Sequence, residues 1–523
     1  MANIEQLPTE VLLLIINLIR PNRDFVALSQ TSRSFYNLTR NELPLRRKYR
    51  RIRIKEKKDF DKAFTILLSI LRRPQLGNYV HHIEFDRPPG GYADYEIKNE
   101  DLKELNDEDL QRLRIAVKNA SFADEYAEKV INMVLQPTEF PWEYSGTRQD
   151  QLRPAWVAQA LTALLVSVSP YLETMTTSQP MFNFTGYHDA AARARMHVGM
   201  TEDIIRFPLE KLLIETNADS QGKPYLQNLR SVEILAHQDS TWEDERFYTD
   251  FDLFGMVSFF NRLPSMERIG TDIVIEDENG LDDLEPFSSN ISRIRIDHSN
   301  LKTWFLLPLI NSCKALKEIR YTIGGRASLD GSFAPFNPRT FLKAILGHRT
   351  TLEVLHIDAD NDCYFVEMEE YGDHRAVERD ENGEEPAHND PQGLWERTGS
   401  LRDFSALTQV NIGIGILLFL AVGTQGMETG DPDYTSFDEL VLADSLPDTL
   451  ESLVIIGYEK GVRADFDKII EQFMIDKDAK LPNLKRVSGI EQMIERAETV
   501  RSPDDESELL WEREEEEWSD YEY

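Results

Sequence analysis

One apolar pattern recurs along most of this chain and limits the folds that it can adopt. An apolar residue, usually leucine, is followed three positions later by a second and, in most copies, soon afterwards by a third. Each copy predicts a turn that leads into a short strand with alternate residues facing inward. A helix or an irregular segment would then return the chain to the next strand, so that each unit covers its neighbour. The copies lie at residues 209–214, 226–234, 263–269, 291–296, 316–319, 352–357, 407–412, 450–455 and 484–487.

This pattern resembles a degenerate leucine-rich repeat. The spacings from Ile269 to Ile294 and from Ile294 to Ile319 are both 25 residues, within the range of about 20–29 residues for such repeats. The resemblance implies an irregular α/β solenoid with mainly parallel strands, in which strands at Ile83 and Met175 precede the copies in one curved sheet. An ordinary α/β domain with leucine-rich strands is the alternative.

The N-terminal segment carries a second strong pattern. Six consecutive apolar residues, 11–16, follow Pro8, and at about 100° per residue they cover every face of a helix. We expect this helix to end near Arg20, a second helix to begin near Asp24, and a third to begin near Ser32. Three short helices cannot bury the whole run among themselves. Part of their surface therefore needs another protein or the rest of the chain.

These N-terminal residues resemble the F-box. The similarity lies in Leu7-Pro8-x-Glu10, the apolar run, Asp24-Phe25 and residues 28–35. It covers roughly residues 5–45 and implies three helices that bind an adaptor protein, which links them to a cullin–RING ubiquitin ligase. The residues expected at the adaptor contact are Leu7, Pro8, Leu28 and Phe35, with Glu10 and Tyr36 at the edge. A plain helical hairpin packed on its own domain is the alternative.

Composition restricts the partners and the compartment. The net charge of −34 and the pI near 4.7 argue against general nucleic-acid binding and against adhesion to anionic membranes. Cys313 and Cys363 are the only cysteines, which suggests a reducing compartment. The sequence shows neither a signal peptide nor an apolar run of the about 20 residues that span a bilayer. We expect a cytoplasmic or nuclear protein.

The sequence predicts four regions. They are an F-box at residues 1–45, a basic linker and helix at 46–75, the repeat-like array at 76–495 with an acidic insertion at 367–390, and an acidic disordered tail at 496–523. The basic residues 46–58 suggest either a nuclear-localisation or phosphate-binding segment, or a solvated linker in which Ile52 and Ile54 alternate as in a strand. The acids and aromatics of the tail suggest either a docking peptide for a basic groove or a solvated tail.

No residue pattern indicates catalysis, a metal site or a cofactor. As the F-box resemblance implies, we expect a non-catalytic substrate receptor that binds the adaptor, through it a cullin, and an unknown protein target. A scaffold that uses the F-box outside a ligase is one alternative, and an enzyme with a cryptic site is another. Arg295 and Arg320 are the predicted target-binding residues, since they are basic positions facing solvent on the predicted strands. They could instead pair across strands and only solvate the sheet.

Overall fold

The structure is a computed structural model that divides into two compact units, which we describe separately. Unit 1 contains Met1–Phe182, Glu202–Val232 and Leu263–Ser265, and unit 2 contains Asn183–Thr201, Glu233–Arg262 and Met266–Tyr523. The described residues are 4, 7–19, 22–87, 102–137, 148–181, 206–219, 222–237, 246–276, 284–327, 336–360, 393–394, 396–424, 437–497, 511 and 513. The predicted acidic insertion, Cys363 and most of the predicted tail lie outside them.

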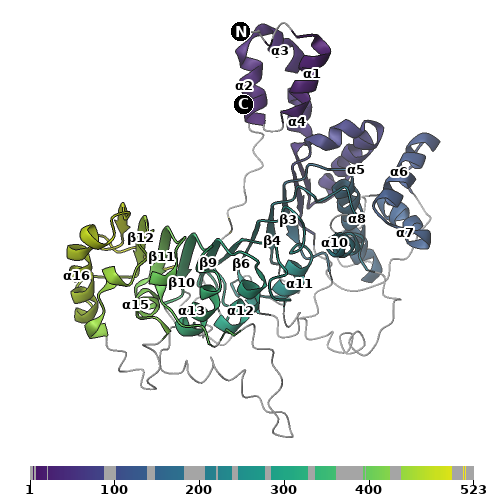
Figure 1. Cartoon of the computed structure of the whole chain (residues 1–523). Coiled ribbons are helices and arrows are strands. Elements are labelled where there is room, and N and C mark those ends of the chain that lie inside the picture. The colour runs from purple at the N-terminus through teal and green to yellow at the C-terminus, as the bar shows by residue number, and fades with distance from the viewer. Residues whose placement is uncertain are drawn as a thin grey trace. The chain divides into compact units, whose positions relative to one another are not determined.

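The main element is a mostly parallel sheet of eleven strands, in the order β1-β2-β3-β4-β6-β8-β9-β10-β11-β12-β13 (Figure 1). These strands are β1 (Arg51–Ile54), β2 (His82–Phe85), β3 (Thr174–Ser178), β4 (Ser231–Leu235), β6 (Arg268–Asp272), β8 (Arg293–Asp297), β9 (Glu318–Thr322), β10 (Val354–Asp358), β11 (Gln409–Gly413), β12 (Ser452–Ile456) and β13 (Arg486–Ser488). A separate parallel pair joins β5 (Thr249–Phe251) to β7 (Val274–Glu276).

Helices precede the sheet and alternate with its strands. The α-helices are α1 (Thr9–Leu18), α2 (Asn22–Thr31), α3 (Arg33–Thr39), α4 (Glu42–Arg50), α5 (Lys57–Arg72), α6 (Asp107–Asn119), α7 (Asp124–Leu135), α8 (Arg148–Ser167), α10 (Pro208–Ala218), α11 (Leu253–Ser258), α12 (Thr303–Ser312), α13 (Pro338–Leu346), α15 (Ile414–Val422) and α16 (Ala464–Lys480). Short 3-10 helices are η2 (Pro74–Tyr79), η5 (Leu401–Asp403), η8 (Phe437–Glu439) and η9 (Leu442–Asp444). None of the helices in the described part of the chain combines the length and apolar character needed to cross a membrane.

The repeated apolar pattern sets the register of unit 2. One apolar residue from each of the last seven copies falls into a single row across seven neighbouring parallel strands. This row is Ile269, Ile294, Ile319, Leu355, Val410, Leu453 and Val487. Helices α12, α13 and α15 lie along one side of these strands (Figure 1), which leaves the alternate side chains of the strands facing away from them. The α/β class and the mainly parallel sheet are confirmed, and the assignment to leucine-rich repeats stays a prediction.

One predicted strand is wrong. Residues 209–214 lie in α10, and the eleventh strand of the sheet is β1. Leu209, Leu212, Leu213 and Thr216 are all buried and follow the i, i+3, i+4, i+7 spacing of one helix face. Pro208 occupies the first turn, where a missing N–H costs nothing. A short leucine pattern is compatible with the spacing of a strand and with that of a helix. Here the residues at the start of the segment, Pro208 among them, favour the helix.

Candidate functional site

The first four helices pack around a small apolar core. Leu12, Ile16, Phe25 and Phe35 form a buried cluster. At the start of α3, the Ser32 hydroxyl accepts a hydrogen bond from the Phe35 N–H at 3.3 Å, which satisfies a backbone donor that the helix leaves free. The predicted order of helices is confirmed, and a fourth helix, α4, follows them where a linker was expected.

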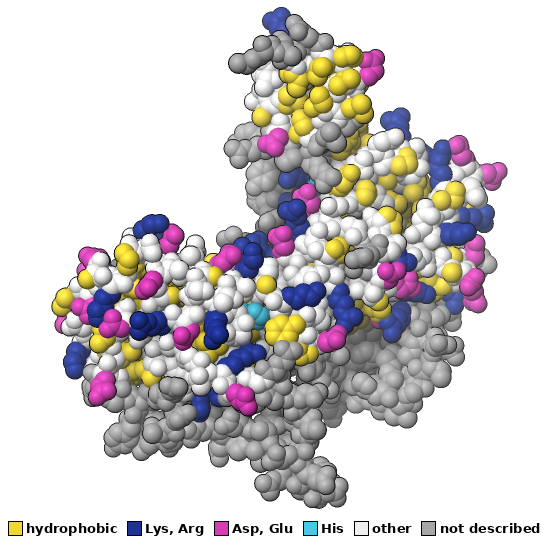
Figure 2. Space-filling view, in the orientation of Figure 1, with side chains coloured by type: hydrophobic (Ala, Val, Ile, Leu, Met, Phe, Trp, Pro, Cys, Tyr) yellow, Lys and Arg dark blue, Asp and Glu magenta, His cyan; other side chains and the backbone are white. Residues whose placement is uncertain are grey.

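The outward face of these helices is apolar. Leu14 is 64% exposed and Tyr36 is 57% exposed. Ile4, Leu7 and Val11 are also exposed, and with Leu14 they are spaced by three, four and three residues, as on one side of a helix. Figure 2 shows hydrophobic side chains gathered on the body that α1–α4 form in Figure 1. We call Ile4, Leu7, Pro8, Val11, Leu14 and Tyr36 the α1 surface.

The structure separates the predicted contact residues into surface and core. Four of them are exposed, namely Leu7, Pro8, Glu10 and Tyr36. Leu28 is partly buried and packs against the core, and Phe35 is only 3% exposed. Phe35 therefore belongs to the buried core of the helices that carry the α1 surface. Sequence reasoning missed Val11 and Leu14, although the spacing that connects them to Leu7 was visible.

A buried arginine closes the base of this helical group. Arg46 Nη1 donates to the Ile19 carbonyl at 2.8 Å, and its guanidinium lies 3.8 Å from the centre of the Phe25 ring. The same group lies 5.2 Å from the Tyr79 ring. Burial lowers the Arg46 pKa, and Glu42 opposes that shift. Arg46 thus joins α4 to the loop after α1, to α2 and to η2.

Two basic residues that follow Arg46 in the segment 46–58 form ion pairs with acidic residues of unit 1. Ile52 and Ile54 are buried in β1, as their alternation predicts. On the same strand, Arg53 pairs with Glu84 at 3.0 Å, and directly after the strand Lys55 pairs with Asp86 at 3.1 Å. These contacts favour the structural interpretation of the segment over a nuclear-localisation or phosphate-binding one.

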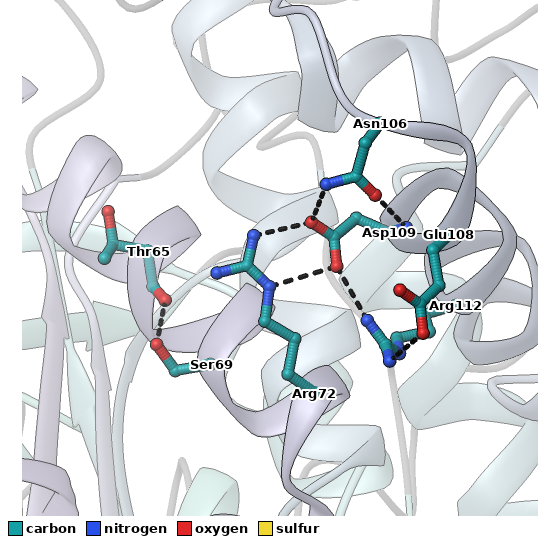
Figure 3. Close-up of polar contacts among 7 residues, drawn as sticks. All are labelled: Thr65, Ser69, Arg72, Asn106, Glu108, Asp109 and Arg112. Carbon is teal, nitrogen blue, oxygen red and sulfur yellow. Dashed lines mark hydrogen bonds and ion pairs between the residues drawn. The ribbon is translucent and has the colours of Figure 1, made fainter.

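A dense polar cluster joins α5 to α6 (Figure 3). Arg72 contacts both Asp109 oxygens, with Nε–Oδ1 at 3.0 Å and Nη2–Oδ2 at 2.5 Å. Asn106 and Arg112 add hydrogen bonds at 2.9 Å and 3.0 Å. The Arg72 hydrogen bonds hold the pKa of Asp109 well below its usual range. Such a fully engaged carboxylate is suited to clamping two helices and cannot readily exchange a proton with a substrate.

Arg295 and Arg320 come together on neighbouring strands of unit 2, as the predicted target site requires. They are in register on β8 and β9. Arg295 Nε pairs with Asp297 Oδ2, and Arg320 Nε contacts Asp297 Oδ1 at 2.5 Å. Asp297 is buried, whereas the Arg295 side chain is 54% exposed. Arg320 thus pairs across strands and Arg295 pairs within its own strand, while the Arg295 side chain stays accessible.

Within the described residues, no group of three or more potential ligand side chains is arranged to hold a metal ion. Cys313 is fully buried, and this burial raises its pKa to about 12. Its thiol is protonated and hidden at neutral pH, which makes it a poor nucleophile.

The α1 surface lies in the part of the chain that matches a known family. Residues 4–51 match the F-box-like family model, a range that includes α1–α4. A search of curated proteins gives no match to this chain. The F-box resemblance at residues 5–45 is thus confirmed and extends through α4, and the protein carries an F-box-like domain.

Proposed function

We propose that this protein is the substrate-recognition subunit of an SCF-type ubiquitin ligase. Its F-box-like domain would bind the adaptor, and unit 2 would bind a protein target. The observation that carries this proposal is the α1 surface, which exposes apolar side chains within the residues that match the F-box-like family. Side chains of this kind at the centre of a protein interface can contribute about 2 kcal/mol or more each.

The role of the chain in the reaction would be geometric. Bound to the adaptor and through it to a cullin, it would hold the target close to the ubiquitin-charged enzyme. Holding two reactants together converts a bimolecular step into an effectively unimolecular one. The residues that transfer ubiquitin would belong to other subunits.

Substitution of Leu14 tests the adaptor contact. Leu14→Glu places a charge in the α1 surface without removing a core residue, and we expect adaptor capture to fall by about tenfold or more. Ile115→Glu is the matched control, because Ile115 is 51% exposed on α6 of the same unit. Full adaptor capture by a folded Leu14→Glu protein contradicts the proposal.

Co-purification separates the ligase from the scaffold alternative. The ligase requires the cullin to be recovered with the adaptor in proportion to the chain. A scaffold outside the ligase would retain the adaptor without cullin.

A further inference from the structure

Two neighbouring strands of unit 2 end on aspartates that are neutralised in different ways. Asp272 on β6 lies in register with Asp297 on β8. The cations beside Asp297 come from the sheet itself, one of them from Arg295 two residues earlier on the same strand. The residue in register with Arg295 on β6 is Gly270. A glycine cannot supply the cation that the equivalent position supplies on β8.

The space above Gly270 holds a second acid. A Cβ atom at Gly270 would lie 2.2 Å from Glu233 Oε2, so the Glu233 carboxylate occupies the place of the absent side chain. Glu233 on β4 and Asp272 on β6 therefore place two carboxyl groups on neighbouring strands of the sheet. Burial raises the pKa of Glu233, and Arg513 is foremost among the charges that oppose this shift.

The cation that pairs with Asp272 comes from the C-terminal segment. Arg513 Nε lies 2.9 Å from Asp272 Oδ2, and Arg513 Nη2 contacts Oδ1. This two-point contact uses the fork of the guanidinium, which a lysine ammonium cannot reproduce. The two residues are 241 positions apart in the chain.

An aromatic site lies beside this arginine site. The Trp511 ring stacks on the His298 ring, with centroids 4.3 Å apart and planes at 22°. Arg326 Nη1 donates to the Trp511 carbonyl, and the Arg326 guanidinium lies 5.7 Å from the Trp511 ring. Gly325 leaves room for the histidine, because a Cβ there would lie 2.8 Å from His298 Nδ1.

Trp511 contacts the aromatic site and Arg513 contacts the arginine site, and these two residues are two positions apart in the C-terminal segment. In an extended chain, side chains at i and i+2 point to the same side, so an extended peptide satisfies both sites at once. We name Glu233, Asp272, His298 and Arg326 the strand-end surface. It contacts an aromatic ring, that of Trp511, and two residues later an arginine, Arg513.

We propose that the strand-end surface is the target-binding surface, that it takes an extended target segment with an aromatic residue two positions before an arginine, and that Trp511 and Arg513 compete for it within the chain. The proposal rests on the proposed function, since a substrate receptor must capture a target. The bound C-terminal segment is the template for the partner.

A labelled peptide with the sequence of residues 509–515, Leu-Leu-Trp-Glu-Arg-Glu-Glu, is the probe, and fluorescence anisotropy is the readout. It is titrated into the full-length chain and into the full-length variant Trp511→Ala with Arg513→Ala. We expect the variant to bind the peptide about tenfold more tightly or better, because the competitor within the chain is lost. Equal affinities for the two chains overturn the proposal.

Changes in the peptide test its specificity without altering the fold of the protein. Replacing its tryptophan and arginine by alanine should abolish binding, and arginine→lysine should weaken it. Retention of full affinity by the alanine peptide overturns the proposal. In the variant chain, Asp272→Asn should weaken binding about tenfold. Asp465→Asn, which removes the partner of Arg463 on α16, should leave it unchanged.

Adaptor capture, measured on the same proteins, separates the two proposals. Peptide binding without adaptor capture would support the strand-end surface and contradict the ligase. Adaptor capture without peptide binding would leave the ligase standing and overturn the strand-end surface.

Discussion

Gly270 on β6 occupies the register position that Arg295 occupies on β8. This single difference leaves Asp272 without the same-strand arginine that serves Asp297, and Arg513 pairs with it instead. The aspartates at the ends of two neighbouring strands thus have different cationic partners. Asp297 pairs with a residue of its own strand, and Asp272 pairs with a residue of the C-terminal segment.

Gly270→Arg should release the C-terminal segment. The new guanidinium would pair with Asp272 from its own strand, as Arg295 pairs with Asp297, and it would displace Arg513. We expect trypsin to cleave after Arg513 about tenfold faster, because the side chain is then free to enter the protease. Mass spectrometry of the released peptide measures the rate.

Gly270→Ala is the matched control for this prediction. Its Cβ requires only the end of the Glu233 side chain to move, and it adds no charge. Cleavage after Arg513 at the wild-type rate in Gly270→Arg would show that Asp272 does not hold the segment.

Arg46→Ala should loosen the F-box-like domain. The change removes the hydrogen bond to the Ile19 carbonyl and the contact with the Phe25 ring, and it leaves a buried carbonyl without that donor. We expect a loss of about 2 kcal/mol in the free energy of local unfolding, measured by hydrogen exchange across α1 and α2. The exposed neighbour Arg47 provides the control, and Arg47→Ala should leave the exchange unchanged. Equal protection in the two variants would rule out this role for Arg46.

Asp109→Asn should separate α5 from α6. The amide cannot accept both Arg72 hydrogen bonds, and we expect hydrogen exchange in α6 to accelerate markedly. Because the folded-state pKa of Asp109 is lowered, its contribution to stability is present above the ordinary pKa of a carboxyl and is lost only in strong acid. The effect of the substitution should therefore be the same at pH 5 and pH 8. Glu108→Gln, which changes an exposed partner of Arg112, is the control, and an effect that varies between these two pH values counts against the clamp.

Asp358→Asn should stabilise unit 2 at neutral pH. Burial raises the pKa of Asp358 to about 6 from its model-compound value of 3.8. Folding therefore favours the protonated acid, and this contribution to stability is lost as the pH rises from about 4 through 6. Asparagine avoids the buried charge, and it still accepts from the Ala497 N–H that contacts Asp358. We expect a gain of at most about 3 kcal/mol at pH 7.5 and little gain at pH 4.

The contribution of His356 to the stability of unit 2 changes with pH in the opposite direction to that of Asp358. Burial lowers its pKa to about 4, so that folding favours the neutral ring and stability falls as the pH drops from about 6.5 toward 4. Denaturant titrations of Asp358→Asn and His356→Asn at several pH values separate the two contributions. A gain for Asp358→Asn that is the same at pH 4 and pH 7.5 would exclude titration of Asp358 as its cause.

Most of the sheet could be predicted because its signal is local. Each copy of the apolar pattern fixes which residues of a short strand face inward, and residues such as Ile294 and Ile319 then align in register. The error at residues 209–214 has the same origin, since Leu209 and Leu212 satisfy both strand and helix spacings. Phe35, predicted at the adaptor contact, is buried in the core of the helices, because an aromatic residue in an amphipathic helix can face either the core or a partner.

Local sequence patterns were enough to predict the first three F-box-like helices, the α/β class and ten of the eleven strands of the sheet, because hydrophobic periodicity and helix caps act over a few residues. The pairing of charged side chains, in contrast, follows from the folded arrangement of the strands. Asp297 pairs with both Arg295 and Arg320, and Asp272 pairs with Arg513. These pairings depend on strand register and on the path of a segment 241 residues away. A contact across such a separation forms only when the intervening chain has folded, so no local pattern encodes it.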